Sequence, residues 1–137
     1  MAEPFQVEVV AADRLVWQGR AVNVIVRTTE GDIGILPGHE PLLAAVVPCA
    51  AEIVTAEGGR EIIAVDGGFV SVTPERVSLL AQYATLASEV KPENAQRDLD
   101  ALQVRMDSGD ATDEEQHRYH LARAQLAVIR RGSDSAH

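Results

Sequence analysis

Few side chains in this sequence could perform chemistry, and they do not form a catalytic set. His117 and His120 are three residues apart, a spacing that would place both on one face of a helix, where they could bind a metal ion. No third ligand stands at a suitable position, and two such histidines are more typical of an exposed helix face. We therefore predict no metal site.

Three consecutive acids, Asp113, Glu114 and Glu115, also resemble acid/base candidates. They open a predicted helix, where carboxylates stabilise the positive end of the helix dipole. The sequence contains neither a GxxxxGK[ST] phosphate loop nor a GxGxxG motif after a strand, and no serine stands in a nucleophile-elbow context. We expect a protein that is not an enzyme and needs no cofactor.

The segment from residue 31 to residue 43 is the most constrained part of the chain. It combines three glycines and two prolines with the apolar residues Ile33, Ile35 and Leu36. Glycine permits positive φ and proline fixes φ, so the segment predicts a bent strand edge and a rigid turn. The turn holds two polar side chains, His39 and Glu40. They could contact a partner or simply form a structural corner, and the residues alone leave both readings open.

Elements that could position these residues fall into two groups. Up to residue 87, short apolar runs alternate with turn residues, which predicts a β-sandwich or flattened barrel of about 8–10 short strands. Val22, Val24 and Val26 are expected on one face of a strand, and Glu57-Gly58-Gly59 is expected to turn a hairpin. The strands expected are 5–11, 21–28, 52–55, 61–65, 69–73 and 76–81.

Near Ser88 the pattern changes, and residues 88–137 predict an antiparallel two-helix hairpin appended to a domain of residues 1–87. Pro92 suits the first turn of a helix, and Thr112 with Glu115 forms a capping box for the second. Gly132 is expected to end that helix, with a frayed tail from residue 133. The apolar stripes are Ala95, Leu99, Leu102, Met106 on the first helix and Tyr119, Ala122, Leu126, Ile129 on the second.

Such a hairpin is marginal alone, because about eight stripe residues must offset the ordering of some 35 residues at roughly 1–2 kcal/mol each. The second helix carries a further apolar strip, Leu121, Ala124 and Val128. This strip needs a surface, either the sandwich or another protein. A lightly docked arm on a rigid body is a physical basis for a switch.

Composition excludes several classes of function. The formal net charge is −9 and only 4% of residues are aromatic, so the core must be aliphatic and nucleic acid is a poor partner. No apolar run approaches the ~20 residues that span a bilayer, and no signal peptide opens the sequence, so we expect no direct membrane insertion. The single cysteine, Cys49, excludes an internal disulfide and is expected to be a buried small hydrophobe.

Residues 30–43, Glu-Gly-Asp-Ile-Gly-Ile-Leu-Pro-Gly-His-Glu-Pro-Leu-Leu, resemble the signature of the epsilon subunit of bacterial F-type ATP synthases. The resemblance continues through residues 65–72, 77–81 and 121–129 and covers nearly the whole chain in order. It implies a non-catalytic rotor subunit in which the sandwich couples the gamma subunit to the c ring. The hairpin would restrain ATP hydrolysis, and the complex would hold the subunit at the cytoplasmic face of the cell membrane.

The resemblance also implies site residues. Glu30, Gly31, Asp32 and nearby His39 would face the c ring. Arg118, Arg123 and Arg130 would engage an acidic segment of the catalytic beta subunits, which assemble with alpha; the alternative is a solvated face with pairs such as Glu114–Arg118.

Some epsilon subunits bind ATP through an Ile/Leu-Asp-x-x-Arg-Ala motif. Here Lys91 and Asn94 replace its aspartate and arginine, so ATP binding by that route is not expected. Two other classes of protein fit the pattern: a stand-alone nucleotide-sensing sandwich module with a helical lid, and an unrelated β-sandwich adaptor.

Overall fold

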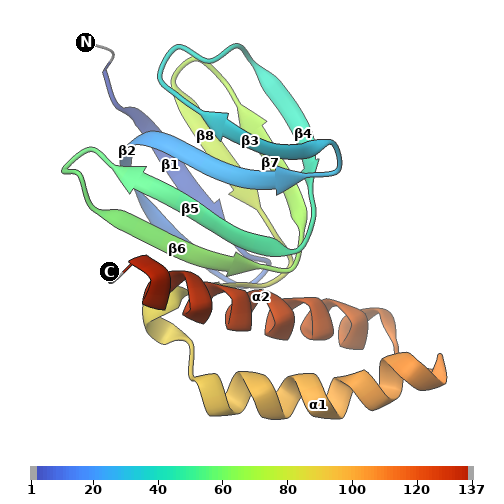
Figure 1. The fold of residues 1–137 in the computed structure, drawn as a ribbon. Helices are drawn as coiled ribbons and strands as arrows, with labels where there is room; N and C mark the ends of the chain where they lie inside the picture. The colour runs from blue at the N-terminus through green and yellow to red at the C-terminus, as the bar shows by residue number, and fades with distance from the viewer. Residues whose placement is uncertain (1–2, 136–137) are drawn as a thin grey trace.

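A folded nine-stranded sheet stands above two antiparallel helices in the computed structural model, which describes residues 3–135 and the side chains up to Arg130 (Figure 1). The elements are β1 (Phe5–Val10), β2 (Leu15–Thr28), β3 (Gly31–Ile35), β4 (Leu42–Val46), β5 (Cys49–Thr55), β6 (Arg60–Val65), β7 (Gly68–Val72), β8 (Arg76–Leu80), β9 (Ala84–Leu86), the 3-10 turn η1 (Ala87–Glu89), α1 (Pro92–Ser108) and α2 (Asp113–Ser135).

The long strand β2 closes the sheet on itself. Its first half pairs with β1, and its second half pairs with β3 and β5. On its other edge β1 pairs in parallel with β8, and the order continues β8-β7-β4 back to β2. The predicted mainly β fold with a helical appendage, a flattened barrel or sandwich followed by a hairpin, is confirmed.

A β-bulge in β2 changes which of its valines share a face. The register between β2 and β5 shifts between Ala21 and Asn23, so buried Ala21 and buried Val24 are three residues apart instead of two. An extra residue in one strand moves the following side chains to the opposite face. The prediction that Val22 shares the face of Val24 and Val26 is therefore wrong, because Val22 is only half-buried.

The interior of the sandwich is aliphatic, as the composition required. Its buried cluster contains a single aromatic side chain, Phe5, among valines, isoleucines, leucine and alanines. Cys49 was expected to be buried, but it is half-buried and packs against the cluster from β5. Aliphatic residues on two facing layers fill such a core without large rings.

Short sequence signals mark where the two helices begin and where α1 ends. Pro92 occupies the first turn of α1, Gly109 caps its end at φ 77°, and Thr112 and Glu115 form the predicted reciprocal capping box. The backbone amide of Thr112, followed by the Arg105 side chain, lowers the pKa of the Glu115 carboxyl. Neither helix among residues 3–135 is long and apolar enough to cross a membrane.

The expected end of α2 at Gly132 is wrong. The helix continues through Gly132 to Ser135, since a glycine inside a helix costs only about 1 kcal/mol relative to alanine and does not force an end. Of the predicted frayed tail, residues 136–137 lie outside the described residues.

Gly68 opens β7 at a place where no other residue fits. Its φ is 138°, and a Cβ atom there would lie 1.9 Å from the Leu80 carbonyl oxygen. We predict that Gly68→Ala lowers the free energy of unfolding by about 3 kcal/mol or more, measured by urea denaturation. Gly58→Ala is the matched control, because Gly58 also has positive φ but open space around it, and should cost only about 1–2 kcal/mol. Equal losses would contradict the steric argument.

Candidate functional site

The acidic turn between β2 and β3 is held rigidly by one buried hydroxyl. The Thr28 hydroxyl donates to the Gly31 carbonyl oxygen (2.8 Å) and accepts from the Glu30 amide (3.1 Å). Gly31 has φ 118°, and the Glu30 and Asp32 side chains are exposed. Asp32 is paired with Arg27 on the adjacent strand at 2.9 Å. The sequence therefore fixes a turn that presents carboxylates to solvent.

His39 lies apart from this turn. It belongs to the turn after β3, where its Nδ1 lies 2.8 Å from the Glu40 carbonyl oxygen. β3 begins within the acidic turn at Gly31 and ends at Ile35, so Glu30 and the turn of His39 lie at opposite ends of a strand about 17 Å long at 3.3 Å per residue. Glu30, Gly31 and Asp32 are brought together, whereas the expectation that His39 lies near them is wrong.

An apolar outer face of the sandwich was missed by the sequence reasoning. Phe69 on β7 is 54% exposed beside its cross-strand partner Leu80, which is 44% exposed, and Leu43 on the neighbouring β4 is 71% exposed. The alternation offered the signal, since Val70 and Val72 point inward and leave Phe69 outward. Exposed apolar groups on one sheet face are typical of an interaction surface.

The apolar part of the seam between sandwich and hairpin is small. The predicted strip on α2 docks on the sandwich: Ala124 and Val128 pack with Ile62 and Ala64 of β6, and Leu121 lies at the edge. Burial contributes ~1.5–3 kcal/mol for each of the two large members, Ile62 and Val128, and less for the alanines.

A contact between a buried carboxylate and a histidine also joins the sandwich to the hairpin. The Asp66 side chain, directly after β6, is fully buried. Its Oδ1 accepts from the Tyr83 amide at 2.9 Å, and its Oδ2 lies 2.5 Å from Nδ1 of His117 on α2. A buried carboxylate is costly unless it is hydrogen-bonded. His117 provides a hydrogen-bond partner for Asp66 from the hairpin. Of the two histidines considered as metal ligands, His117 contacts Asp66 across the seam.

Weaker contacts flank this pair. The Tyr83 hydroxyl donates to Glu114 (3.2 Å), and Gln125 donates to the Thr85 hydroxyl (3.1 Å). Glu114 therefore has a partner in the sandwich, and the Glu114–Arg118 pair of the alternative reading is not among the ion pairs of residues 3–130.

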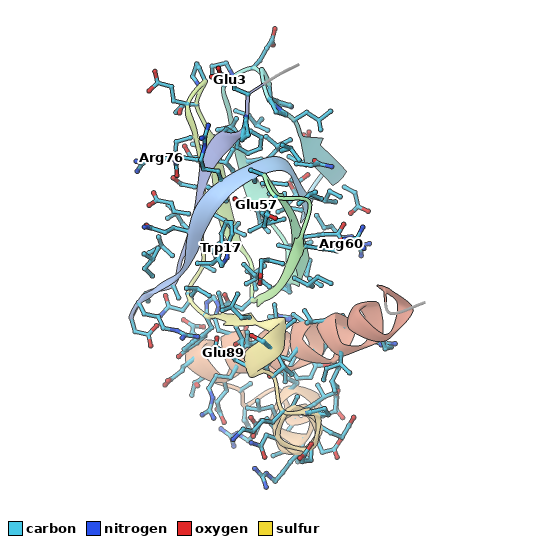
Figure 2. The ribbon with its side chains drawn as sticks, turned by 90° about the vertical axis from the view of Figure 1, so that its left-hand side faces the viewer. Glu3, Trp17, Glu57, Arg60, Arg76 and Glu89 are labelled. Carbon is cyan, nitrogen blue, oxygen red and sulfur yellow. The ribbon has the colours of Figure 1, made fainter. Side chains whose placement is uncertain are left out.

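Arg14 reaches the junction between the two parts of the molecule. It pairs with Glu89 of η1 at 3.3 Å. Figure 2 shows Glu89 at the point where the strands are followed by the helices. The guanidinium of Arg14 is the main cause that lowers the pKa of the Glu89 carboxyl.

The three predicted arginines on α2 do not share one environment. All three are exposed, but Arg118 lies near the start of the helix, whereas Arg123 and Arg130 border a cavity between α2 and the sandwich. Arg123 lies over the Tyr119 ring, 5.8 Å from its centre. At the positions where the family's ATP-binding motif is lost, Lys91 precedes α1, and the Asn94 side-chain oxygen accepts from Arg97 (2.8 Å).

Sandwich and docked hairpin together define a class of ATP synthase subunits. The family model described as "ATP synthase, Delta/Epsilon chain, beta-sandwich domain" matches residues 4–87. Helices and sandwich superpose on a chain of the Euglena gracilis mitochondrial ATP synthase (OSCP/F1/c-ring) with a TM-score of 0.67 at 19% identity, covering 100% of this chain and 84% of that one. This likeness concerns the fold.

Relatives in sequence show which of these ATP synthase subunits the chain resembles. An ATP synthase epsilon chain of Cutibacterium acnes is 50% identical over 135 residues, 93% of this chain and 92% of the relative. One from Streptomyces griseus is 49% identical over 111 residues, 81% and 87% of the two chains. The chain belongs to the ATP synthase epsilon-chain family, as the signature at residues 30–43 indicated. It is an accessory, non-catalytic rotor subunit of an F-type ATP synthase.

Removing the partner of Asp66 should loosen the hairpin. We predict that His117→Ala costs α2 about 1–3 kcal/mol of protection in amide hydrogen exchange, because the buried carboxylate loses its partner. The sandwich strands should keep their protection. His39→Ala, a change at a half-buried histidine in the turn after β3, is the control and should alter neither region. Unchanged exchange in α2 of the His117 variant would show that the apolar strip alone holds the hairpin.

Proposed function

We propose that the two parts of this rotor subunit divide its work. The sandwich, residues 1–87, joins the gamma subunit to the c ring, and the hairpin, residues 88–137, restrains ATP hydrolysis by the alpha and beta subunits. The observation that carries this proposal is the small seam: the sandwich holds the hairpin through the contact of buried Asp66 with His117 and through a small apolar strip. The complex places the subunit at the cytoplasmic face of the membrane without insertion of its own.

The acidic turn Glu30-Gly31-Asp32 is the proposed contact with polar loops of the c ring. Its backbone is fixed by Thr28, so its carboxylates keep one position as the rotor turns. His39 is proposed as a second, separate point of contact, because β3 lies between it and the turn.

The apolar face of Phe69, Leu80 and Leu43 is the proposed contact with gamma. This face lies on β4, β7 and β8, and its Phe69 and Leu80 also border a pocket together with His117 and His120 of α2. Large apolar side chains at such exposure are stabilised when a partner removes them from water.

The hairpin can exist in two states because its docking energy is modest. In the docked state all three arginines are exposed, and Arg123 and Arg130 also border the cavity between α2 and the sandwich. Release would carry all three arginines toward an acidic segment of the beta subunits, where guanidinium groups form bidentate pairs with carboxylates. A partner's preference of a few kcal/mol would be enough to shift the population.

Reversing charge at the acidic turn tests the c-ring contact. We predict that Glu30→Arg weakens proton pumping driven by ATP hydrolysis in membrane vesicles, while the folding stability changes by less than ~0.5 kcal/mol. Glu57→Arg makes the same charge change on the exposed β5–β6 turn and should pump normally. Normal pumping by the Glu30 variant would place the c-ring contact elsewhere.

Removing the hairpin tests the restraint. A variant that lacks residues 92–137 should still assemble, and its ATP hydrolysis in inverted membranes should rise relative to synthesis, because the brake is gone. Arg118→Ala with Arg123→Ala should reproduce part of this rise, and Arg97→Ala on α1 is the control. Unchanged hydrolysis in the truncated variant would refute the restraint, and failed assembly would make the hairpin a structural part of the complex.

A further inference from the structure

The contact between His117 and Asp66 joins a half-exposed histidine of the hairpin to a buried acid of the sandwich. Nδ1 of His117 lies 2.5 Å from Oδ2 of Asp66, and the two side chains are 49% and 0% exposed. The other carboxylate oxygen, Oδ1, accepts from the Tyr83 amide at 2.9 Å. An ionised carboxylate only accepts hydrogen bonds, so Nδ1 of His117 carries the hydrogen and Nε2 is the nitrogen that gains or loses a proton. Because half of the side chain reaches solvent, water can deliver that proton.

Protonation of His117 strengthens this contact without changing its partners. A neutral ring donates one hydrogen bond to Asp66, whereas an imidazolium donates the same bond as part of an ion pair. The added attraction acts beside a buried carboxylate, where the effective dielectric is lower than in water. In the released hairpin His117 makes no such contact, so its protonation favours the docked state. This stabilisation is complete when His117 is protonated and is lost as the pH rises through the range, near about 6.5, in which histidine ordinarily titrates.

The remaining charges around His117 nearly balance. Besides Asp66, the titratable and charged groups near it are Tyr83 from the segment before β9, and Asp113, Glu114, Arg118, His120 and Arg123 on α2. The two acids of α2 offset its two arginines. Burial first, then the hydrogen bond to Glu114, raises the pKa of the Tyr83 hydroxyl, so Tyr83 remains neutral in this range. Asp66 is therefore the charge that decides the effect of protonating His117.

His120 acts in the opposite direction. It borders the same pocket as His117, three residues further along α2. Burial first, then the charges of Arg123 and His117, lowers the pKa of His120. The docked state thus favours neutral His120, and this contribution to docking is lost as the pH falls through the range of a free histidine. We expect the effect of His117 to be the larger one, because His117 contacts the buried carboxylate directly.

We propose that the contact of His117 with Asp66 makes the docking of the hairpin sensitive to pH, so that the hairpin is held more firmly near about pH 6 than near about pH 8. The proposal rests on the two-state hairpin described under the proposed function and adds a proton as its regulator. Release is then favoured in the more alkaline part of this range. The restraint of ATP hydrolysis is engaged more often there, and less often when the surrounding solution is acidic.

The test is amide hydrogen exchange on the full chain at pH 6, 7 and 8, with each rate corrected for the intrinsic pH dependence of exchange. Protection of α2 should fall by roughly fivefold or more from pH 6 to pH 8, the order of the difference between a neutral hydrogen bond and one between charged groups. Protection of the sandwich strands, which do not depend on the seam, should change much less.

Two variants identify the groups responsible. His117→Gln keeps a hydrogen-bond donor but cannot gain a charge, and Asp66→Asn keeps an acceptor for the Tyr83 amide but carries no charge. Both should remove the pH dependence of α2. His120→Gln is the matched control and should keep this dependence, with a larger amplitude because the opposing histidine is gone.

A pH dependence that persists in His117→Gln or in Asp66→Asn, or that disappears in His120→Gln, would overturn the proposal. So would equal protection of α2 at all three pH values in the unchanged chain. The measurement needs no other subunit, whereas the restraint of ATP hydrolysis is measured in membranes. Failure of the pH dependence and failure of the restraint are therefore separate results.

Discussion

The arrangement of this subunit depends on how one buried carboxylate is satisfied. Asp66 stands at the end of β6, inside the molecule, with one hydrogen bond from its own domain and one partner, His117, from the hairpin. A carboxylate without partners in an apolar interior is costly, so the docked hairpin and the end of β6 stabilise each other. The apolar contact beside it is built mainly from small side chains and cannot fix the orientation of α2 by itself.

Much of the fold could be predicted because its signals are local. Glycine turns, alternating valines, the proline at the start of α1 and the capping box at Thr112 each act within a few residues. The bulge in β2 could not be predicted, because its position is set by pairing with β5, which is distant in sequence. Gly132 gave a wrong prediction although its signal is local. Glycine often ends a helix, but α2 continues through Gly132.

The candidate sites also divide into those with local sequence signals and those formed by residues far apart in the sequence. The acidic turn could be located from Glu30 and Asp32 because one hairpin contains it, whereas grouping His39 with it ignored the length of β3. The pairing of Asp66 with His117 spans 51 residues, and the sequence offered only an acid at the end of an apolar strand. The cavity at Arg27, Arg123 and Arg130 likewise exists only once the hairpin is docked.

A small seam has a functional consequence that a large one would lack. If docking were stabilised by a broad apolar interface, a partner could not reverse it with the few kcal/mol that differential binding provides. Here the groups that hold α2 are one polar pair, a short strip and weak exposed hydrogen bonds, while the sandwich is closed by β2 and has its own aliphatic core. The sandwich can therefore transmit torque as a rigid body, while the arm it carries remains free to respond to its surroundings.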